Sequence, residues 1–506
     1  MKKNKSAFNA VVLLTVTMLI VKILSAIYRV PYQNILGDTG LYAYQQVYPI
    51  VAIVSVLSLN AIPSAISQNH YQKQTIKRLW IFLQTTSIIL LLCNILFSSI
   101  IAKLMGDAHL SSMLQIASLV LLPFPIVALM RGQLQKHHDM ETIAKSQLID
   151  QVVRVSTIMI AIVLFVHQGL TIYQSGAISI FGSMLGISSC LVYLAIKKVS
   201  IYPKLSAIGD TEPFRAALKG FITLSLFYSL SYLILILWQV VDSFTVINML
   251  KRSMSLHDAR IQKGIYDRGS SLIQIGLIVT TSFSLVLIPL LSESKQKCQF
   301  GLMNDYASSA LKITIIFATA ASVGLMNLMV PFNIFLFKGG EGSVSLVIYM
   351  LSIIFVSMIM MYTGMLQIYN RYRIQCIAVG LGLVVKIIMN VLLIPSLQIN
   401  GASIATVSGL AVYAFVLQMQ IQQLYTLKWR YFIVRWGLTL LLMSAIIQMV
   451  LLIPYSGRSG AFVIAMIGVI VGISVVVYAM IKMKIITARE WHHLPFGHVM
   501  IKLMRE

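Results

Sequence analysis

Basic side chains recur inside long apolar segments of this 506-residue chain, where lipid or protein would surround them. Lys22 and Arg29 follow an uncharged run, residues 6–21, and Pro31 comes two residues after the arginine. At about 100° per residue the two bases share one helix face, and the proline bends the helix just beyond them. A base in mid-span costs roughly 2.5–3.5 kcal/mol, so each must reach the interface or line a polar cavity. We expect both to line a cavity; the alternatives are that Lys22 snorkels and that Arg29 marks a helix end.

Two further arginines extend this pattern. Arg154 lies two turns into an apolar segment with Asp150 four residues before it, and a local ion pair is the alternative to cavity lining. Arg268 closes the basic stretch 251–269, and we expect it at the outer mouth of the cavity, with a surface charge at a helix start as the alternative. Arginine and lysine together match phosphate well, so these bases predict an anionic cargo.

The composition identifies the protein class. The chain is 58% hydrophobic and 11% charged, against about 25% charged residues in soluble domains, which predicts an all-α integral membrane protein. In such a protein the net charge of +24 reflects basic loops that set the topology and contact anionic lipid headgroups, and it does not indicate a nucleic-acid partner. The four cysteines and nine histidines show no disulfide framework and no metal spacing, so we expect no metal and no cofactor.

About fourteen apolar segments are long enough to cross a bilayer. Most of the 39 lysines and arginines fall in the breaks on the side of the two termini, which places both termini in the cytoplasm. Five of the opposing bases crowd into residues 251–269, which runs against this rule and predicts another use for that loop. The segments are residues 8–36, 42–67, 79–104, 112–130, 146–166, 171–196, 221–247, 270–291, 311–336, 343–368, 374–395, 401–424, 434–454 and 460–481.

The chain also repeats part of itself. At a constant offset of 232, "RGQLQ" (131–135) pairs with "TGMLQ" (363–367), and Arg154 pairs with Lys386. The offset keeps the direction of each segment, which is typical of a parallel repeat about an axis normal to the membrane. We therefore predict two six-helix lobes in parallel pseudo-repeat around a central cavity, as in an alternating-access transporter. The predicted divisions are an N-terminal lobe (1–219), a C-terminal lobe (220–430) and two further helices with a cytoplasmic tail (431–506).

Several motifs resemble the SpoVB/MurJ-type branch of the MOP exporter superfamily, the Gram-positive polysaccharide biosynthesis branch. They are "KILSAIYRVPYQNILGDTGLYAYQQVYPI" (22–50), "IPSAIS" (62–67), "KGIYDRGSSLIQIG" (263–276) and "NGASIATVSG" (400–409). The resemblance implies a V-shaped cavity between two lobes in a multi-pass protein of the bacterial cell membrane. It implies a flippase, not an enzyme, that carries undecaprenyl-diphosphate-linked glycans such as lipid II to the outer leaflet. Membrane lipids and cell-wall synthesis enzymes are the expected partners of a monomer.

The resemblance also extends to individual residues. The branch lines its cavity with arginines from spans 1, 2 and 8, and the resemblance matches Lys22 and the pair Tyr28-Arg29 to span 1 and Arg268 to span 8, while the span-2 arginine has no counterpart near Val56. Some relatives bind sodium with an acid on the seventh span and two polar residues four apart on the eleventh, positions that Asp242, Lys386 and Asn390 resemble here. Since a lysine ammonium would occupy the ion's place, we predict an Asp242–Lys386 ion pair with Asn390 bonded beside it, and no sodium. The alternative is that Lys386 faces the cavity as the repeat counterpart of Arg154.

Two other functions remain as alternatives. A MATE-like multidrug or cation antiporter would require buried carboxylates facing its cargo, whereas the apolar segments hold one deep acid, Asp242, against four bases. A membrane glycosyltransferase or ligase would require acidic motifs at a membrane face, and the outer loops hold only scattered acids. A flippase forms no covalent bond, so we expect no catalytic residues.

Overall fold

The computed structural model describes most of the chain. Lys22, one of the predicted cargo-binding bases, lies outside the described residues. The side chains of residues 278–290, 292–293, 296 and 430–431 are likewise not described. The described residues are 17, 20–21, 23–69, 71–203, 213–369, 371–425, 430–483 and 485.

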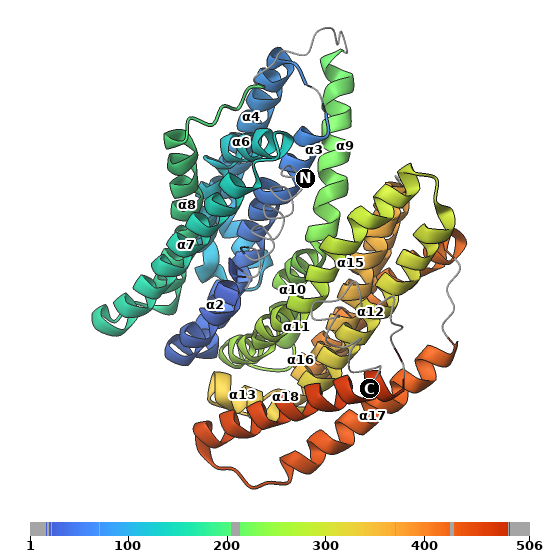
Figure 1. Ribbon diagram of the computed structural model, residues 1–506. Helices are drawn as coiled ribbons and strands as arrows, with labels where there is room; N and C mark the ends of the chain where they lie inside the picture. The colour runs from blue at the N-terminus through green and yellow to red at the C-terminus, as the bar shows by residue number, and fades with distance from the viewer. Residues whose placement is uncertain are drawn as a thin grey trace. The chain divides into compact units, whose positions relative to one another are not determined.

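All regular structure in the described part of the chain is helical, which confirms the predicted all-α class (Figure 1). The helices fall into two compact units, Met1–Asp267 with Lys386–Gln398, and Arg268–Val385 with Ile399–Glu506. The first unit contains α2 (Arg29–Val56), α3 (Ile62–Ser67), α4 (Lys73–Leu104), α5 (Ser111–Ser118), α6 (Phe124–Lys136), α7 (Met140–Gln168), α8 (Ile172–Ile196), α9 (Phe214–Tyr232) and α10 (Ile234–Leu250). The second contains α12 (Phe300–Asn327), α13 (Met329–Phe337), α14 (Ser343–Met350), α15 (Ser352–Ile368), α17 (Arg430–Leu451) and α18 (Gly457–Lys482). Two helices, α11 (Leu256–Gln296) and α16 (Tyr372–Leu424), contribute to both.

The helix α2 is a hairpin. Gly37 interrupts it with φ 73°, in the left-handed region that glycine adopts without a Cβ penalty. The hydroxyls of Tyr28 and Tyr44, sixteen residues apart, lie 3.0 Å from each other, although a straight helix would separate them by about 24 Å. The chain therefore reverses at Gly37, close to the break that the sequence predicts between its first two spans.

The long helix α16 reverses in the same way. Gln398 has φ 52° and ψ −132°, which breaks the helical path. Arg371 Nη1 then lies 3.5 Å from Gln420 Oε1, and the two residues lie 49 positions apart in the chain. The reversal falls between the predicted spans 374–395 and 401–424.

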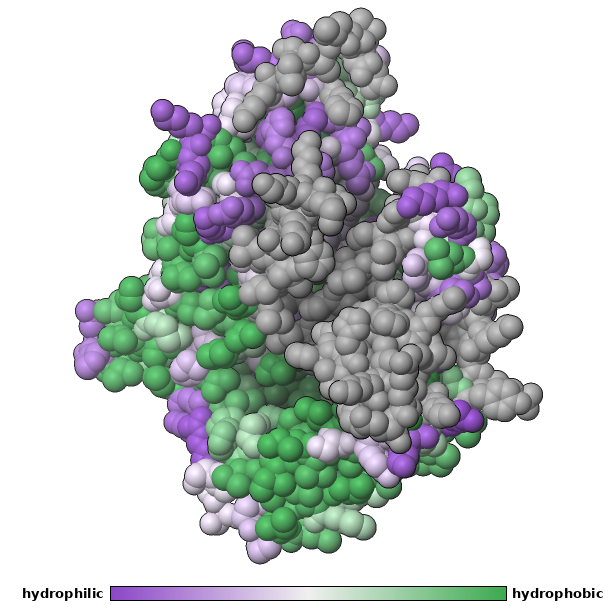
Figure 2. Space-filling view, viewed as in Figure 1, coloured by the Kyte–Doolittle hydropathy of each residue, from purple (hydrophilic) through white to green (hydrophobic). Residues whose placement is uncertain are grey.

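The surface of the helices suits lipid. Nine helices in the described part of the chain are long and apolar enough to cross a membrane, or up to eleven if two bent pairs count as one span each. On α4 the side chains of Ile89, Leu92 and Leu96 are exposed, and apolar side chains cover much of the face seen in Figure 2. The protein is thus a multi-pass membrane protein. Each predicted apolar segment overlaps a described helix, although much of residues 8–28 in the first segment lies outside the described residues, and the count of fourteen crossings stays a prediction.

Candidate functional site

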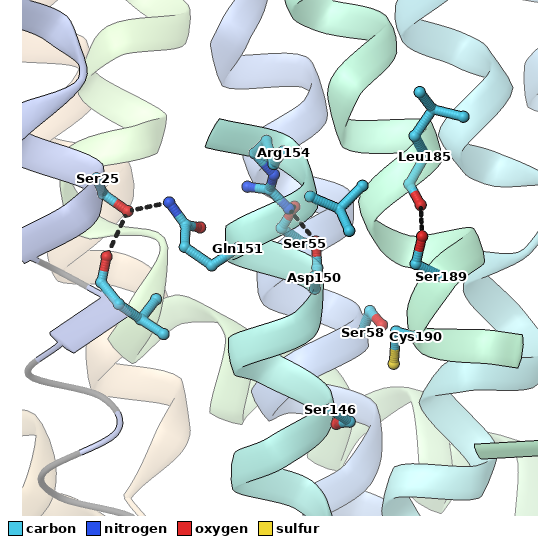
Figure 3. A network of polar contacts seen from close by, with 12 residues as sticks. Ser25, Ser55, Ser58, Ser146, Asp150, Gln151, Arg154, Leu185, Ser189 and Cys190 are labelled. Carbon is cyan, nitrogen blue, oxygen red and sulfur yellow. Dashed lines mark hydrogen bonds and ion pairs between the residues drawn. The ribbon is translucent and has the colours of Figure 1, made fainter. Parts of the chain in front are cut away.

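Arg154 is held near the midpoint of α7. It lies fourteen residues from either end of the helix, or about 21 Å at 1.5 Å per residue. Its Nη2 donates to Asp150 Oδ1 at 2.9 Å and to Ser55 Oγ of α2 at 3.5 Å (Figure 3). One turn away, Gln151 Nε2 donates to Ser25 Oγ at 2.9 Å. The local pair with Asp150 is therefore present, and it lies deep in the membrane-spanning segment.

A second guanidinium shares Asp150, and sequence reasoning missed it. Arg131 of α6 is fully buried, and its Nη2 lies 4.0 Å from Asp150 Oδ2. Its remaining partners are neutral: Nε donates to Ser146 Oγ at 3.1 Å, Nη1 to Ser58 Oγ at 3.3 Å and Nη2 to Cys190 Sγ at 3.2 Å. Its position just after an apolar segment is typical of an interfacial base. The one signal that could have singled it out is that it opens the repeated motif "RGQLQ".

Two glycines of α8 allow this arrangement. A Cβ on Gly186 would lie 2.6 Å from both Asp150 O and Asp150 Oδ1, and one on Gly182 would lie 3.1 Å from Arg154 O. Glycines four residues apart let neighbouring helices approach closely in a membrane. Any larger residue at position 186 would therefore displace the carboxylate that the two arginines share.

Arg29 is buried among tyrosines. Its side chain is fully buried, and its guanidinium carbon lies 5.9 Å from the ring centroid of Tyr28 and 5.4 Å from that of Tyr48. Tyr44 stacks on Tyr48 with centroids 5.6 Å apart. The same tyrosines interact electrostatically with Arg154, so Arg29 and Arg154 gather around one aromatic group in the first unit.

The residues Asp242, Lys386 and Asn390 meet in the first unit. Lys386 Nζ donates to Asp242 Oδ2 at 2.8 Å, and Asn390 Nδ2 donates to Oδ1 at 3.2 Å. All three side chains are buried. This geometry matches the predicted pair, whereas a role in coupling stays a prediction. Sequence reasoning missed Tyr266, whose hydroxyl donates to Asp242 Oδ2 at 2.9 Å.

A second buried ion pair lies on α11 next to this group. Lys263 Nζ lies 2.5 Å from Asp267 Oδ1, and both side chains are buried. The Lys263 ammonium also lies 5.3 Å from the ring centroid of Tyr266. Tyr266 thus contacts both pairs, with its ring near Lys263 and its hydroxyl on Asp242.

The basic stretch 251–269 contacts the loop that follows α4. Arg260 binds Asp107 with two hydrogen bonds, Nε to Oδ2 at 3.0 Å and Nη2 to Oδ1 at 2.9 Å, and Lys251 Nζ donates to Gly106 O at 2.6 Å. Tyr173 also donates to Asp107 Oδ2, at 2.6 Å. Burial alone would raise the pKa of Asp107, but the hydrogen bonds from Tyr173 and Arg260 outweigh it and hold that pKa below its usual range.

Arg268 belongs to the second unit and is buried there. Its Nη1 donates to Asn333 Oδ1 at 2.9 Å, its Nη2 lies 3.9 Å from Glu341 Oε2, and its guanidinium carbon lies 5.6 Å from the ring centroid of Phe337. With 1% of its surface exposed, it is not the simple surface charge kept as an alternative. Its predicted place at a cavity mouth stays a prediction.

Both buried bases and buried acids lie in the polar interior of the described chain, and the bases are the more numerous. In that part of the chain, no group of three or more His, Cys, Asp or Glu side chains could hold a metal ion. What the arrangement offers instead is guanidinium groups with hydroxyl and tyrosine neighbours, which can bind phosphoryl oxygens by charge and by directed N–H donors.

Known proteins that are similar to this chain include polysaccharide biosynthesis proteins and a lipid II flippase. Residues 7–295 match the family model described as "Polysaccharide biosynthesis protein". The Bacillus subtilis (strain 168) protein "Uncharacterized membrane protein YabM" is 34% identical over 505 residues, covering 96% of this chain and 94% of YabM. "Lipid II flippase MurJ" of the same organism is 25% identical over 445 residues, covering 80% and 81%. A solved structure of lipid II flippase MurJ in an inward closed conformation shares the fold, with a TM-score of 0.72 at 18% identity, covering 93% of this chain and 99% of that one.

Proposed function

Because the chain belongs to the polysaccharide biosynthesis protein family, in the MurJ- and SpoVB-like branch of the MOP exporter superfamily, we propose that it is a flippase. Its cargo is an undecaprenyl-diphosphate-linked glycan precursor, either lipid II or a related cell-wall or capsular intermediate. It carries this lipid from the inner to the outer leaflet of a bacterial plasma membrane. The chain works as a monomer, and cell-wall synthesis enzymes receive its cargo.

The observation that carries this proposal is the excess of positive charge in the group of Arg131, Asp150 and Arg154. Arg29, Arg131 and Arg154 are all buried, and a single carboxylate, Asp150, contacts two of them. Arg131 and Arg154 thus share one carboxylate, and the net positive charge that remains is costly in a membrane interior, which points to an anionic ligand that binds there during the cycle. A diphosphate supplies the charge and the oxygen acceptors that guanidinium groups match best. Lys22 and Arg268 complete the proposed cargo-binding set.

The proposed cycle is alternating access. The positive-inside rule places both termini in the cytoplasm, so residues 251–269 and the loop after α4 face outward. The contacts of Arg260 with Asp107 and of Lys251 with Gly106 then close the outer side and must open for cargo to leave. These contacts give a role to bases that the positive-inside rule would not place on the outer side.

The Asp242–Lys386 pair bears on which ion gradient or potential drives transport. The lysine ammonium lies where a monovalent cation would meet the carboxylate, with Asn390 bonded beside it. We propose that this fixed internal cation replaces a transported sodium ion. The inward-negative membrane potential, which supplies about 2.3 kcal/mol per charge per 100 mV, then resets the empty, cation-lined cavity.

A MATE-like cation antiporter is the second candidate, and the same pair argues against it. Such a transporter needs a carboxylate that can receive a cationic cargo, whereas Asp242 already binds Lys386, Asn390 and Tyr266. In the first unit Asp150 is likewise engaged by two arginines.

The test in cells is depletion of the protein, followed by mass spectrometry of undecaprenyl-linked lipids. We expect one diphosphate-linked intermediate to accumulate on the cytoplasmic side, and its glycan identifies the cargo. An unchanged lipid profile, together with an altered sensitivity to cationic drugs, would favour the antiporter.

A further inference from the structure

The group of Arg131, Asp150 and Arg154 contains two cations for one anion. Asp150 Oδ1 binds Arg154 and Oδ2 faces Arg131, and no other base among the described residues lies within 4.0 Å of this carboxylate. The other three hydrogen-bond partners of Arg131 are the side chains of Ser58, Ser146 and Cys190, and these groups are neutral. The group therefore keeps a net charge of +1.

Arg154 has an N–H group that can donate a hydrogen bond to an anion attracted by this net charge. Its side chain is about nine-tenths buried, and among the described residues its Nε has no hydrogen-bond partner. The hydroxyl of Ser55 lies beside Nη2 at 3.5 Å, which adds a second donor (Figure 3). A buried donor without a partner costs free energy that a bound acceptor would recover.

The two arginines differ in what they can do. All three guanidinium nitrogens of Arg131 have protein partners, so this side chain cannot bind a ligand without losing them. The side chain of Arg154, by contrast, hydrogen-bonds only Asp150 and Ser55 among the described residues. Arg131 is thus suited to acting on the site through Asp150, by drawing part of the carboxylate's charge away from Arg154.

From this arrangement we infer that Arg154 and Ser55 form an anion site at mid-membrane depth, and that Arg131 is the positioning residue that leaves this site with a net positive charge by sharing Asp150 with Arg154. The inference rests on the proposed function, since the anion is the phosphoryl group of the lipid-linked cargo on its way across. Without Arg131, Asp150 would neutralise Arg154 and the site would lose its charge. The site depends on the net charge of three residues, not on a single side chain.

Charge-restoring variants test this directly. Arg131→Gln brings the group to zero net charge, Asp150→Asn raises it to +2, and the double variant returns it to +1. The full-length protein in nanodiscs is titrated with undecaprenyl diphosphate, and bound lipid is measured by native mass spectrometry. Undecaprenol, which lacks the charge, is the reference ligand. Arg252→Gln, which removes a base from an exposed loop position, is the matched control.

We expect Arg131→Gln to weaken binding of the diphosphate by on the order of tenfold, which is the effect of one unit charge at about 12 Å and an effective dielectric constant of about 20. The double variant and Arg131→Lys should bind within about threefold of the unmodified protein, Asp150→Asn should bind more tightly, and undecaprenol should bind all of them equally. A purely structural Arg131 would instead make the double variant at least as weak as Arg131→Gln, which overturns the inference. Equal binding of the diphosphate and undecaprenol by the unmodified protein would contradict the proposed function as well. The experiment therefore distinguishes a failure of this inference from a failure of the proposed function.

Discussion

Lys386 Nζ lies 2.8 Å from Asp242 Oδ2, although 144 residues separate the two in the chain and both side chains are buried. The pair joins α10 to a short part of α16, Lys386–Gln398, which belongs to the first unit while both of its flanks belong to the second. Asn390 and Tyr266 complete the shell around the carboxylate. One ion pair thus fixes the middle of a long helix to a helix far away in sequence.

Breaking this pair from either side should destabilise the protein. Asp242→Asn or Lys386→Met leaves a charge buried without its partner, which costs about 3–5 kcal/mol. Thermal unfolding of the purified protein should show a lower melting temperature for each single variant and a partial recovery for the double variant. Additive losses in the double variant would show that the two residues do not act as a pair. Sodium-dependent transport that Asp242→Asn abolishes would contradict the proposed coupling.

Gly264 should tolerate no side chain. A Cβ at this position of α11 would overlap the backbone carbonyl of Asp38, next to the reversal of α2, and only backbone movement could relieve the overlap. Gly264→Ala should therefore reduce transport severely. Gly220→Ala on α9 is the control: apart from the adjoining residues of its own helix, no described atom lies within 4 Å of its added Cβ, and alanine favours the helix by up to about 1 kcal/mol. Full transport by Gly264→Ala would mean that α11 does not need this close approach.

The Asp107–Arg260 contact should make stability depend on acidity. The pKa of Asp107 is lower in the folded protein than in the unfolded chain, so its contribution is complete above the unfolded value of about 3.9 and is lost as pH falls through the folded value. At pH 7 Asp107→Asn should melt at a lower temperature than the unmodified protein. The difference should shrink as the pH falls below about 4. A difference that stays constant with pH would contradict an ionised Asp107.

The cargo-binding bases should be needed for transport and not for folding. Lys22→Gln, Arg29→Gln and Arg268→Gln should each abolish complementation of a depleted strain, while protein level and membrane insertion stay normal. Arg29→Lys keeps the charge but loses the planar contact with Tyr28 and Tyr48, so we expect intermediate activity. Arg252→Gln should be fully active. Full activity in all three glutamine variants would refute the assignment.

Much of this architecture was predictable because bilayer thickness and hydropathy constrain the sequence directly. The predicted breaks near residues 37–41 and 396–400 coincide with Gly37 and Gln398, where the backbone leaves the helical region. The Asp242–Lys386 pair was predicted from the resemblance to relatives with an acid on the seventh span and two polar residues four apart on the eleventh, together with the cost of an unpaired charge in lipid.

The remaining contacts depend on packing across large sequence separations. Asp107 and Arg260 both lie in loops or at helix ends, where a charge has no need of a partner, so nothing local marks them as a pair. The sequence position of Arg131 is typical of an interfacial base. The residue is nevertheless buried, because Gly132 lets α6 approach Ile66 of α3. Which guanidinium shares which carboxylate follows from helix approach, and periodicity carries no information about it.

The central claim is tested most directly by reconstituting the purified protein into liposomes with a labelled undecaprenyl-diphosphate-linked glycan. Labelled glycan that reaches the opposite leaflet becomes accessible to an added, membrane-impermeant modifying enzyme. We predict translocation that depends on the protein, rises with an inward-negative potential, needs no sodium and is lost in Arg154→Gln. Translocation no faster than in protein-free liposomes, for every undecaprenyl-diphosphate-linked glycan tried, would contradict the account.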